Sequence, residues 1–193
     1  MKKLAIVAAI ATSAAVAAPF NGFSVGGSLG VNFTKHKFTV AGVETSKNKT
    51  GFLGNVFAGY TKSFSNMIAG ADVVLGLSNV KGDGVRVTKT IRTTSIAIAP
   101  RVGYKFNETS AVYAKFAIAH NSYNFDAAAA LLMKKKNISY TPAVGFEKFV
   151  NSNGSVRAEL GYEMSKYKLP AGSAVSKASK NAVVATVGYA YSF

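Results

Sequence analysis

His120 and Ser122 are the two side chains whose types and spacing could perform nucleophilic chemistry. Residues two apart share one face of a strand, so the imidazole could act as a general base for the hydroxyl. Such a pair needs a carboxylate to orient the imidazole, but the segment where that acid would be expected, residues 134–136, is all lysine. The other histidine, His36, lies among lysines without a second histidine or a carboxylate nearby. The sequence therefore predicts no enzyme activity, no metal site and no cofactor.

Charged residues also occupy alternate positions of otherwise apolar segments. Between Val156 and Met164, for example, the intervening positions carry Arg157, Glu159 and Glu163. Charges that share one face of a strand point to a polar interior, where acids and bases would pair. The alternative is that they line a narrow ion-conducting path. The predicted interior charge network consists of Asp72, Arg101, Lys105, Lys115, Glu147, Arg157, Glu159 and Glu163.

Most of the remaining basic residues lie between the apolar segments. The chain has 23 Lys and Arg against 8 Asp and Glu, a net charge of +15. A basic surface of this kind predicts binding to a polyanion, although a compositional bias toward lysine would produce the same pattern. Nucleic acid is not expected, because aromatic residues do not alternate regularly with the bases in these segments. The polyanion-binding candidates are Lys35, Lys37, Lys47, Lys49, Lys81, Arg86, Lys89, Lys134, Lys135, Lys136, Lys168, Lys177 and Lys180.

The elements that carry these residues are strands. A glycine followed by an aromatic residue recurs about every 43 residues, at Tyr60, Tyr104, Phe146 and Tyr189, and the first three copies lead into Asn/Ser/Gly-rich turns. This spacing accommodates two strands, a tight turn and a long loop. Eight strands are predicted, at about 22–34, 51–64, 67–79, 92–106, 110–123, 138–149, 155–166 and 181–193. The long loops then cover about 34–50, 80–91, 124–137 and 167–180.

The polarity of the strand faces indicates that lipid surrounds the sheet. The apolar face carries the large side chains, whereas the opposite face is small or charged; a water-soluble barrel would have the reverse pattern. No stretch is apolar for long enough to form a membrane-spanning helix. The predicted fold is all-β: an eight-stranded antiparallel up-and-down transmembrane β-barrel. Residues 124–136 suit a short helix in the third long loop, or a continuation of the hairpin.

The first 17 residues resemble a secretory signal peptide. Lys2 and Lys3 precede an apolar run, and Ala15-Val16-Ala17 forms a cleavage motif. The expected domains are a signal peptide, 1–17, and a barrel domain, 18–193.

Taken together, the signal peptide, the glycine–aromatic repeat and the segment from Val187 to Phe193 resemble small OmpA/OmpX-like outer-membrane barrels of Gram-negative bacteria. The resemblance implies an integral protein of the bacterial outer membrane, surrounded by its lipid and lipopolysaccharide. The last strand resembles the signal read by the barrel-assembly machinery, with Gly188, Tyr189, Tyr191 and Phe193 at the matching positions.

For function, the sequence predicts a structural or adhesin-like surface protein whose lysine-rich loops bind lipopolysaccharide or polyanions on a host surface. One alternative is a narrow porin or ion channel. The other is a lipid A-modifying enzyme, because the spacing of His120 and Ser122 resembles the His-x-Ser of lipid A deacylases.

Overall fold

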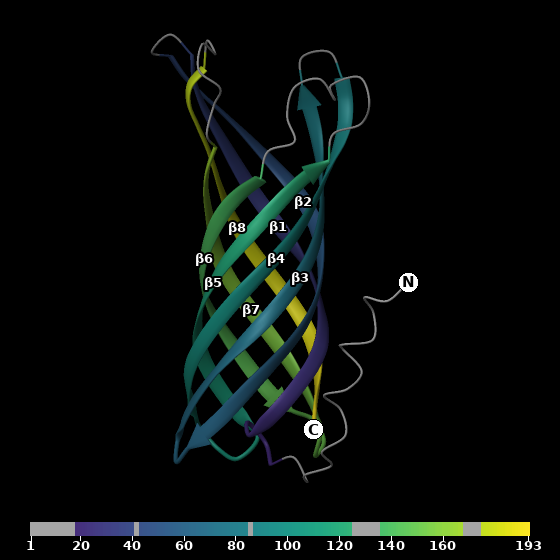
Figure 1. The fold of residues 1–193 in the computed structure, drawn as a ribbon, viewed down its shortest axis with the longest axis vertical. Helices are drawn as coiled ribbons and strands as arrows, with labels where there is room; N and C mark the ends of the chain where they lie inside the picture. The colour runs from purple at the N-terminus through teal and green to yellow at the C-terminus, as the bar shows by residue number, and fades with distance from the viewer. Residues whose placement is uncertain (1–17, 41–42, 85–86, 125–135, 168–174) are drawn as a thin grey trace.

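The computed structural model describes residues 18–40, 43–84, 87–124, 136–167 and 175–193. These residues form one closed antiparallel barrel in which each strand pairs with its neighbours in sequence and the last pairs with the first (Figure 1). Within them, no helix is long and apolar enough to cross a membrane. The strands are β1 (Gly22–Val40), β2 (Val43–Phe64), β3 (Met67–Gly84), β4 (Val87–Lys105), β5 (Ser110–Asn124), β6 (Lys136–Phe149), β7 (Gly154–Tyr167) and β8 (Val175–Ser192).

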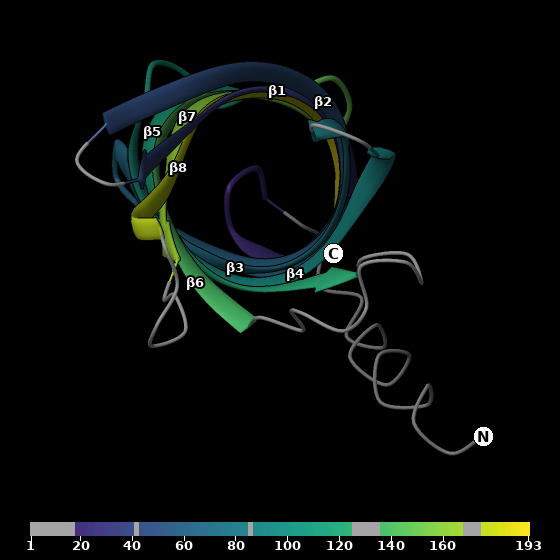
Figure 2. The same cartoon turned by 90° about the horizontal axis from the view of Figure 1, so that it is seen from above.

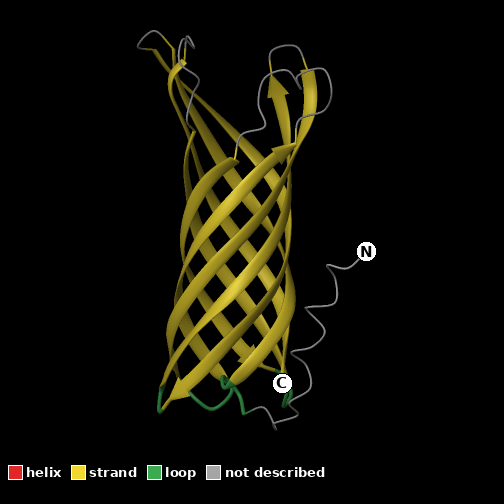
Figure 3. Ribbon diagram, in the orientation of Figure 1, coloured by secondary structure: helices red, strands yellow, loops and turns green. Residues whose placement is uncertain are grey.

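The predicted fold class and strand count are confirmed, and the three tight turns lie where the sequence placed them. They share one end of the barrel, which we call the turn end; the opposite end, where β1–β2 and β3–β4 extend furthest, is the long-hairpin end (Figure 3). Asparagine side chains build two of the turns: Asn107 accepts from the Thr109 amide at 3.0 Å, and Asn151 accepts from the Gly154 amide at 2.6 Å. Such caps satisfy backbone donors that the ladder leaves open.

The prediction of long loops at 34–50 and 80–91 was wrong. β1 and β2 stay in register up to Val40 opposite Val43, and β3 and β4 up to Gly84 opposite Val87. Both segments contain β-branched residues, such as Val40 and Val43 in the first hairpin and Thr90 and Ile91 in the second, and these residue types favour strands. β8 likewise begins at Val175, inside the predicted fourth loop. The predicted signal peptide and most of the predicted helix, residues 125–135, lie outside the described residues.

The outer wall is apolar, as the alternation predicted. Leu29 is 76% exposed and Ile98 and Val187 are more than half exposed, although such residues belong in the core of a soluble protein. The closed ring leaves no strand edge unpaired in the wall between the long hairpins and the turns (Figure 2). An apolar outer band on a closed sheet is what the hydrocarbon of a bilayer requires.

Two prolines on this outer face interrupt the ladder locally. Between β4 and β5 the pairing passes from Ile98 directly to Arg101, which skips Pro100 and the residue before it. Between β6 and β7 it passes from Tyr140 to Ala143, which skips Pro142 and the residue before it. Proline has no amide hydrogen to donate, so each interruption lies on the side where that donor would have pointed.

Candidate functional site: the lumen and the cationic rim

Four buried charged side chains meet inside the barrel toward its turn end, and we call them the Arg–acid cluster: Asp72 of β3, Arg101 of β4, Glu147 of β6 and Arg157 of β7. Glu147 binds both guanidinium groups, with Oε2 2.8 Å from Arg101 Nη1 and Oε1 2.9 Å from Arg157 Nε. Asp72 Oδ2 lies 3.5 Å from Arg157 Nη1 and 3.9 Å from Arg101 Nε. Each side chain comes from a different strand, so the cluster ties opposite walls of the barrel together.

Neutral groups also bond to the cluster or cover it. Arg101 donates to the Thr61 hydroxyl, Ser155 Oγ donates to Glu147 at 2.6 Å, and Arg157 donates to Ser24 Oγ at 3.4 Å. Aromatic rings cover the two guanidinium groups: Tyr113 lies 5.2 Å from Arg101 Cζ and Phe57 lies 4.8 Å from Arg157 Cζ. All four charged residues are between 1% and 4% exposed. The cluster is therefore neutral overall and largely dry.

Two further ion pairs lie nearer the long-hairpin end. Lys115 pairs with Glu159, which also accepts a hydrogen bond from the Tyr113 hydroxyl at 2.7 Å. Lys180 Nζ lies 3.0 Å from Glu163 Oε1. Seven of the eight residues predicted for the interior network thus take part in ion pairs. Lys105 is the exception: it is half-buried and no ion pair joins it to another described residue.

Lys180 therefore occupies a different place from the one that the sequence predicted. It was assigned to the rim as a polyanion-binding candidate, but it is 6% exposed and faces the lumen. The prediction began the last strand at Asn181, one residue after Lys180 and six residues after the observed start at Val175. Lys180 shares the parity of Ala182 and Ala190, both buried, and extending the alternation by one residue would have revealed it.

A cavity of about 160 Å³ lies among these two ion pairs. Its lining combines the four charged side chains with amides, hydroxyls, small residues and a few aliphatic side chains such as Leu53 and Val74. One lining amide, that of Asn32, has a buried oxygen without a hydrogen-bond partner in the structure. A second hollow of about 30 Å³ lies beside Asp72 and Arg157. Water is the natural occupant of polar spaces of this size.

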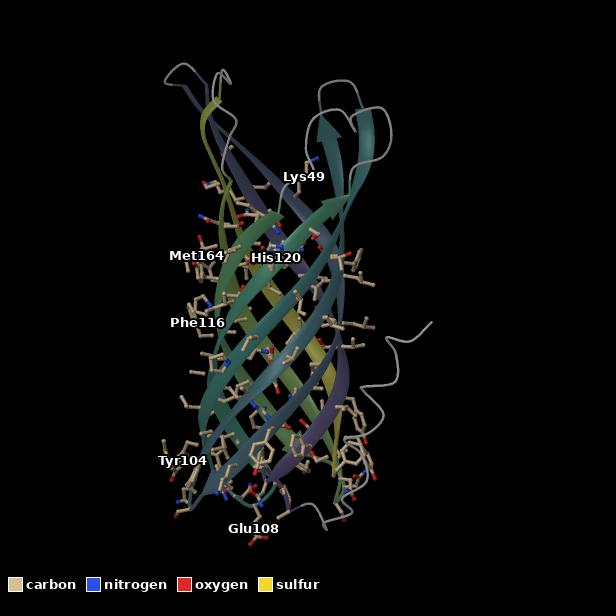
Figure 4. All side chains as sticks on the ribbon, in the orientation of Figure 1. Lys49, Tyr104, Glu108, Phe116, His120 and Met164 are labelled. Carbon is tan, nitrogen blue, oxygen red and sulfur yellow. The ribbon has the colours of Figure 1, made fainter. Side chains whose placement is uncertain are left out.

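The rim candidates lie mainly on the strand extensions. Lys35 is exposed on β1, and Lys49 is half-buried on β2; Figure 4 shows Lys49 toward the long-hairpin end and Glu108 at the turn end. Strand positions are also occupied by Lys37, Lys47, Lys81, Lys89, Lys136 and Lys177. The other candidates, Arg86, Lys134, Lys135 and Lys168, lie outside the described residues.

The His120–Ser122 pair lies on the outer face of β5; His120 is labelled in Figure 4. Both side chains are exposed, and His120 stands opposite Ile96 on one neighbouring strand and Ile138 on the other. Among the described residues neither side chain is bonded to a carboxylate, and no group of His, Asp and Glu side chains is arranged to hold a metal ion. The enzyme alternative stays a prediction, as does the ion channel.

The terminal aromatic segment closes the ring. The Phe193 amide donates to the Phe23 carbonyl at 2.9 Å, and Ser192 stands opposite Ser24 of β1. Tyr191 is exposed on the outer wall, and its ring centroid lies 5.1 Å from that of Phe193. Gly188 and Tyr189 precede them on the same strand. The residues predicted to form an assembly signal therefore lie at the seam where the last strand meets the first.

Comparison with known proteins agrees with this architecture. The model of the outer membrane protein beta-barrel domain matches residues 4–193. The chain is similar in structure to AlkL, solved by solid-state NMR in DMPC bilayers, with a TM-score of 0.55 and 13% identity over 94% of each chain. It is also similar to Neisserial surface protein A, with a TM-score of 0.51 and 14% identity over 90% of this chain and 98% of that one.

These low identities show a shared fold and nothing of a shared activity. No curated protein sequence matches the chain. The family model, however, covers nearly all of it, from the fourth residue to the last. The protein therefore belongs to the family of outer membrane proteins defined by this β-barrel domain.

Proposed function

We propose that this outer-membrane barrel acts as a surface protein whose long-hairpin end binds polyanions, with lipopolysaccharide phosphates as the nearest candidates. One observation carries the proposal: the β1–β2 hairpin continues past the apolar band and holds a concentration of basic residues. Lys35 and Lys37 lie on its first strand and Lys47 and Lys49 on its second, with Glu44 as the only acid in the hairpin. Such a surface attracts anions over about one Debye length, roughly 8–10 Å at ordinary salt.

The location of the rim favours a membrane-associated polyanion. In outer-membrane barrels the short turns face the periplasm and the longer connections face outward, so the basic hairpin would stand beside the phosphate groups of the outer leaflet. A lysine near an anionic surface contributes about 1 kcal/mol to binding, or about fivefold in affinity. Sulfated or phosphorylated glycans on another cell offer the same chemistry, which would give the protein an adhesin-like role.

The test compares two triple variants with the same change of net charge. The first, Lys35→Gln/Lys37→Gln/Lys47→Gln, neutralises the hairpin; the second, Lys62→Gln/Lys105→Gln/Lys148→Gln, neutralises the turn end. Retention of the detergent-solubilised protein on immobilised heparin and on immobilised lipopolysaccharide is measured against salt concentration. We expect the unmodified barrel to be eluted by salt, and the hairpin variant to elute at a lower concentration than either the unmodified protein or the turn-end variant.

Equal losses in the two variants would show that net charge alone determines retention, and retention that does not respond to salt would contradict the proposal. Binding to heparin without binding to lipopolysaccharide would favour a glycan on another cell. If the protein binds both heparin and lipopolysaccharide, lipopolysaccharide is favoured as the ligand, because it is present in the same membrane.

We infer in addition that the protein reaches the outer membrane by way of residues 1–17 as a signal peptide, and that the barrel-assembly machinery recognises the last strand. The resemblance of Gly188, Tyr189, Tyr191 and Phe193 to OmpA/OmpX-like barrels supports the second point. The accumulation of Phe193→Ala protein in the periplasm instead of the membrane fraction would support it, and normal insertion of this variant would contradict it.

A further inference from the structure

The four residues before β1, Ala18 to Asn21, turn back across the turn end of the barrel. The Asn21 amide donates to the Ala18 carbonyl at 3.0 Å, which closes a tight turn. Phe20 lies in this turn with a φ of +63° and is only 3% exposed. Viewed along the barrel axis, the purple start of the chain passes inside the ring of strands (Figure 2). The side chain of Phe20 is therefore buried at the turn end of the lumen, against Phe149.

The backbone conformation of Phe20 indicates that contacts with its surroundings hold the residue in place. A positive φ is a steric outlier for a residue with a bulky side chain, and it persists only where the surroundings compensate for it. The compensation here is apolar contact. The ring of Phe20 lies edge-on to that of Phe149, with centroids 4.9 Å apart, and both belong to a buried cluster with Ile68, Ala111 and Tyr113.

This apolar cluster adjoins the Arg–acid cluster on the side nearer the turns. Phe149 follows Glu147 by two residues on β6 and shares its inward face. Tyr113 belongs to the apolar cluster and also covers Arg101, with its ring 5.2 Å from the guanidinium carbon. Glu147 and Asp72 are only 1% and 2% exposed, although they lie near an end of the barrel. Something must exclude water there, because a lumen open at the turns would hydrate these carboxylates.

We propose that the segment from Ala18 to Asn21 is an N-terminal plug, in which Phe20 seals the turn end of the lumen against water and ions from the periplasm. The plug and the Arg–acid cluster form two barriers in series, one apolar and one charged. This role is independent of polyanion binding at the opposite end. It would keep the polar cavity at the long-hairpin end separate from the periplasm and so preserve the permeability barrier of the membrane.

The absence of cysteine from the chain allows a direct test. Ala111 is fully buried beside Phe20, so an Ala111→Cys variant places one thiol behind the plug. The protein is isolated from membranes in detergent and treated with a negatively charged methanethiosulfonate reagent, and the rate of modification is followed by mass spectrometry. We expect Phe20→Ala to raise this rate at least tenfold, whereas Phe20→Leu, which keeps a large apolar side chain, should leave it within about twofold.

A matched control separates sealing from general loosening of the barrel. Ser152→Cys, in the exposed β6–β7 turn, should react at the same rate whether it is combined with Phe20→Leu, with Phe20→Ala or with neither. Each variant is first shown to be folded by the difference in gel migration between unboiled and boiled samples. If Phe20→Ala is not folded, Phe20→Gly takes its place, because glycine removes the ring and accepts the positive φ. The proposal would be overturned by a folded ring-deleted variant in which the thiol introduced by Ala111→Cys reacts as slowly as it does behind Phe20.

Discussion

The two halves of the lumen differ although the same eight strands enclose them. Toward the turns, the interior is filled by the Arg–acid cluster and by large side chains such as Phe57, Tyr113 and Phe149. Toward the long hairpins, the same strands present alanines, including Ala97, Ala117 and Ala119, and a cavity of about 160 Å³ remains. The difference lies in side-chain volume and not in the backbone, because an eight-stranded barrel encloses only enough space for side chains.

Glycine on a neighbouring strand makes room for large side chains in the filled half. A Cβ added to Gly145 would collide with the ring of Tyr113, and one added to Gly59 would collide with the carboxylate of Asp72. The filled half is therefore a fitted arrangement that tolerates little change. The half toward the long hairpins has room for water, which can solvate the remaining charge when one member of an ion pair is removed. Mutations of the same type should have different consequences in the two halves.

The largest effect is expected from removing one arginine of the filled half. Arg157→Ala leaves Asp72 and Glu147 with a single compensating cation in a dry environment, and we expect it to lower the free energy of unfolding by about 3–5 kcal/mol. The measurement is equilibrium urea unfolding in lipid vesicles, followed by circular dichroism.

Lys105→Ala is the matched control, since Lys105 lies at the same end of the barrel, beside the turns, without an ion pair to a described residue; it should cost less than about 1 kcal/mol. A small effect of Arg157→Ala would show that water reaches the cluster, and the contrast between the two halves would disappear.

The second-largest difference is expected when a larger side chain is introduced into each half of the lumen. Ala111→Leu adds volume where Phe20, Ile68 and Tyr113 already touch, and we expect a loss of about 1–3 kcal/mol in the free energy of unfolding. Ala117→Leu, also on β5, would instead extend into the cavity and should cost less than about 1 kcal/mol by the same measure. Equal costs would mean that the cavity is too constrained to accept a side chain.

A double-mutant cycle on Lys115 and Glu159 should give a coupling free energy smaller than the effect of Arg157→Ala. Their side chains are 12% and 18% exposed, against 1–5% for the charged groups of the Arg–acid cluster. We expect a coupling of about 1–2 kcal/mol in the free energy of unfolding from Lys115→Met, Glu159→Gln and the double variant. A coupling as large as the Arg157→Ala effect would place this pair in an equally dry environment.

The smallest effect is expected at the rim. Lys35→Gln changes an exposed side chain outside both halves of the lumen and should alter the free energy of unfolding by no more than about 0.5 kcal/mol. The same substitution contributes to the loss of polyanion retention proposed above. Destabilisation by more than this amount would mean that the hairpin supports the barrel as well as displaying charge.

The barrel, its strand count and the lipid-facing side of each strand could all be predicted from the residues alone. Alternation at period 2 is a local property of the chain, and the recurrence of glycine–aromatic pairs located the turns. The same parity identified Asp72, Arg101, Glu147 and Arg157 as interior residues. It failed at the strand ends, where polar residues of β1 to β4 show no apolar alternation, and at Lys180, one residue beyond the predicted start of β8.

Which interior charges meet could not be predicted, because pairing depends on register and on the height of each residue in the barrel. Glu147 reaches both arginines, whereas Lys105 reaches no described acid. The structure also showed how the interior is divided. Phe20 precedes the first strand and has no place in the alternation, so nothing in its sequence neighbourhood indicates that it enters the lumen. Its burial follows from closure of the ring, which brings Phe149 to the same opening.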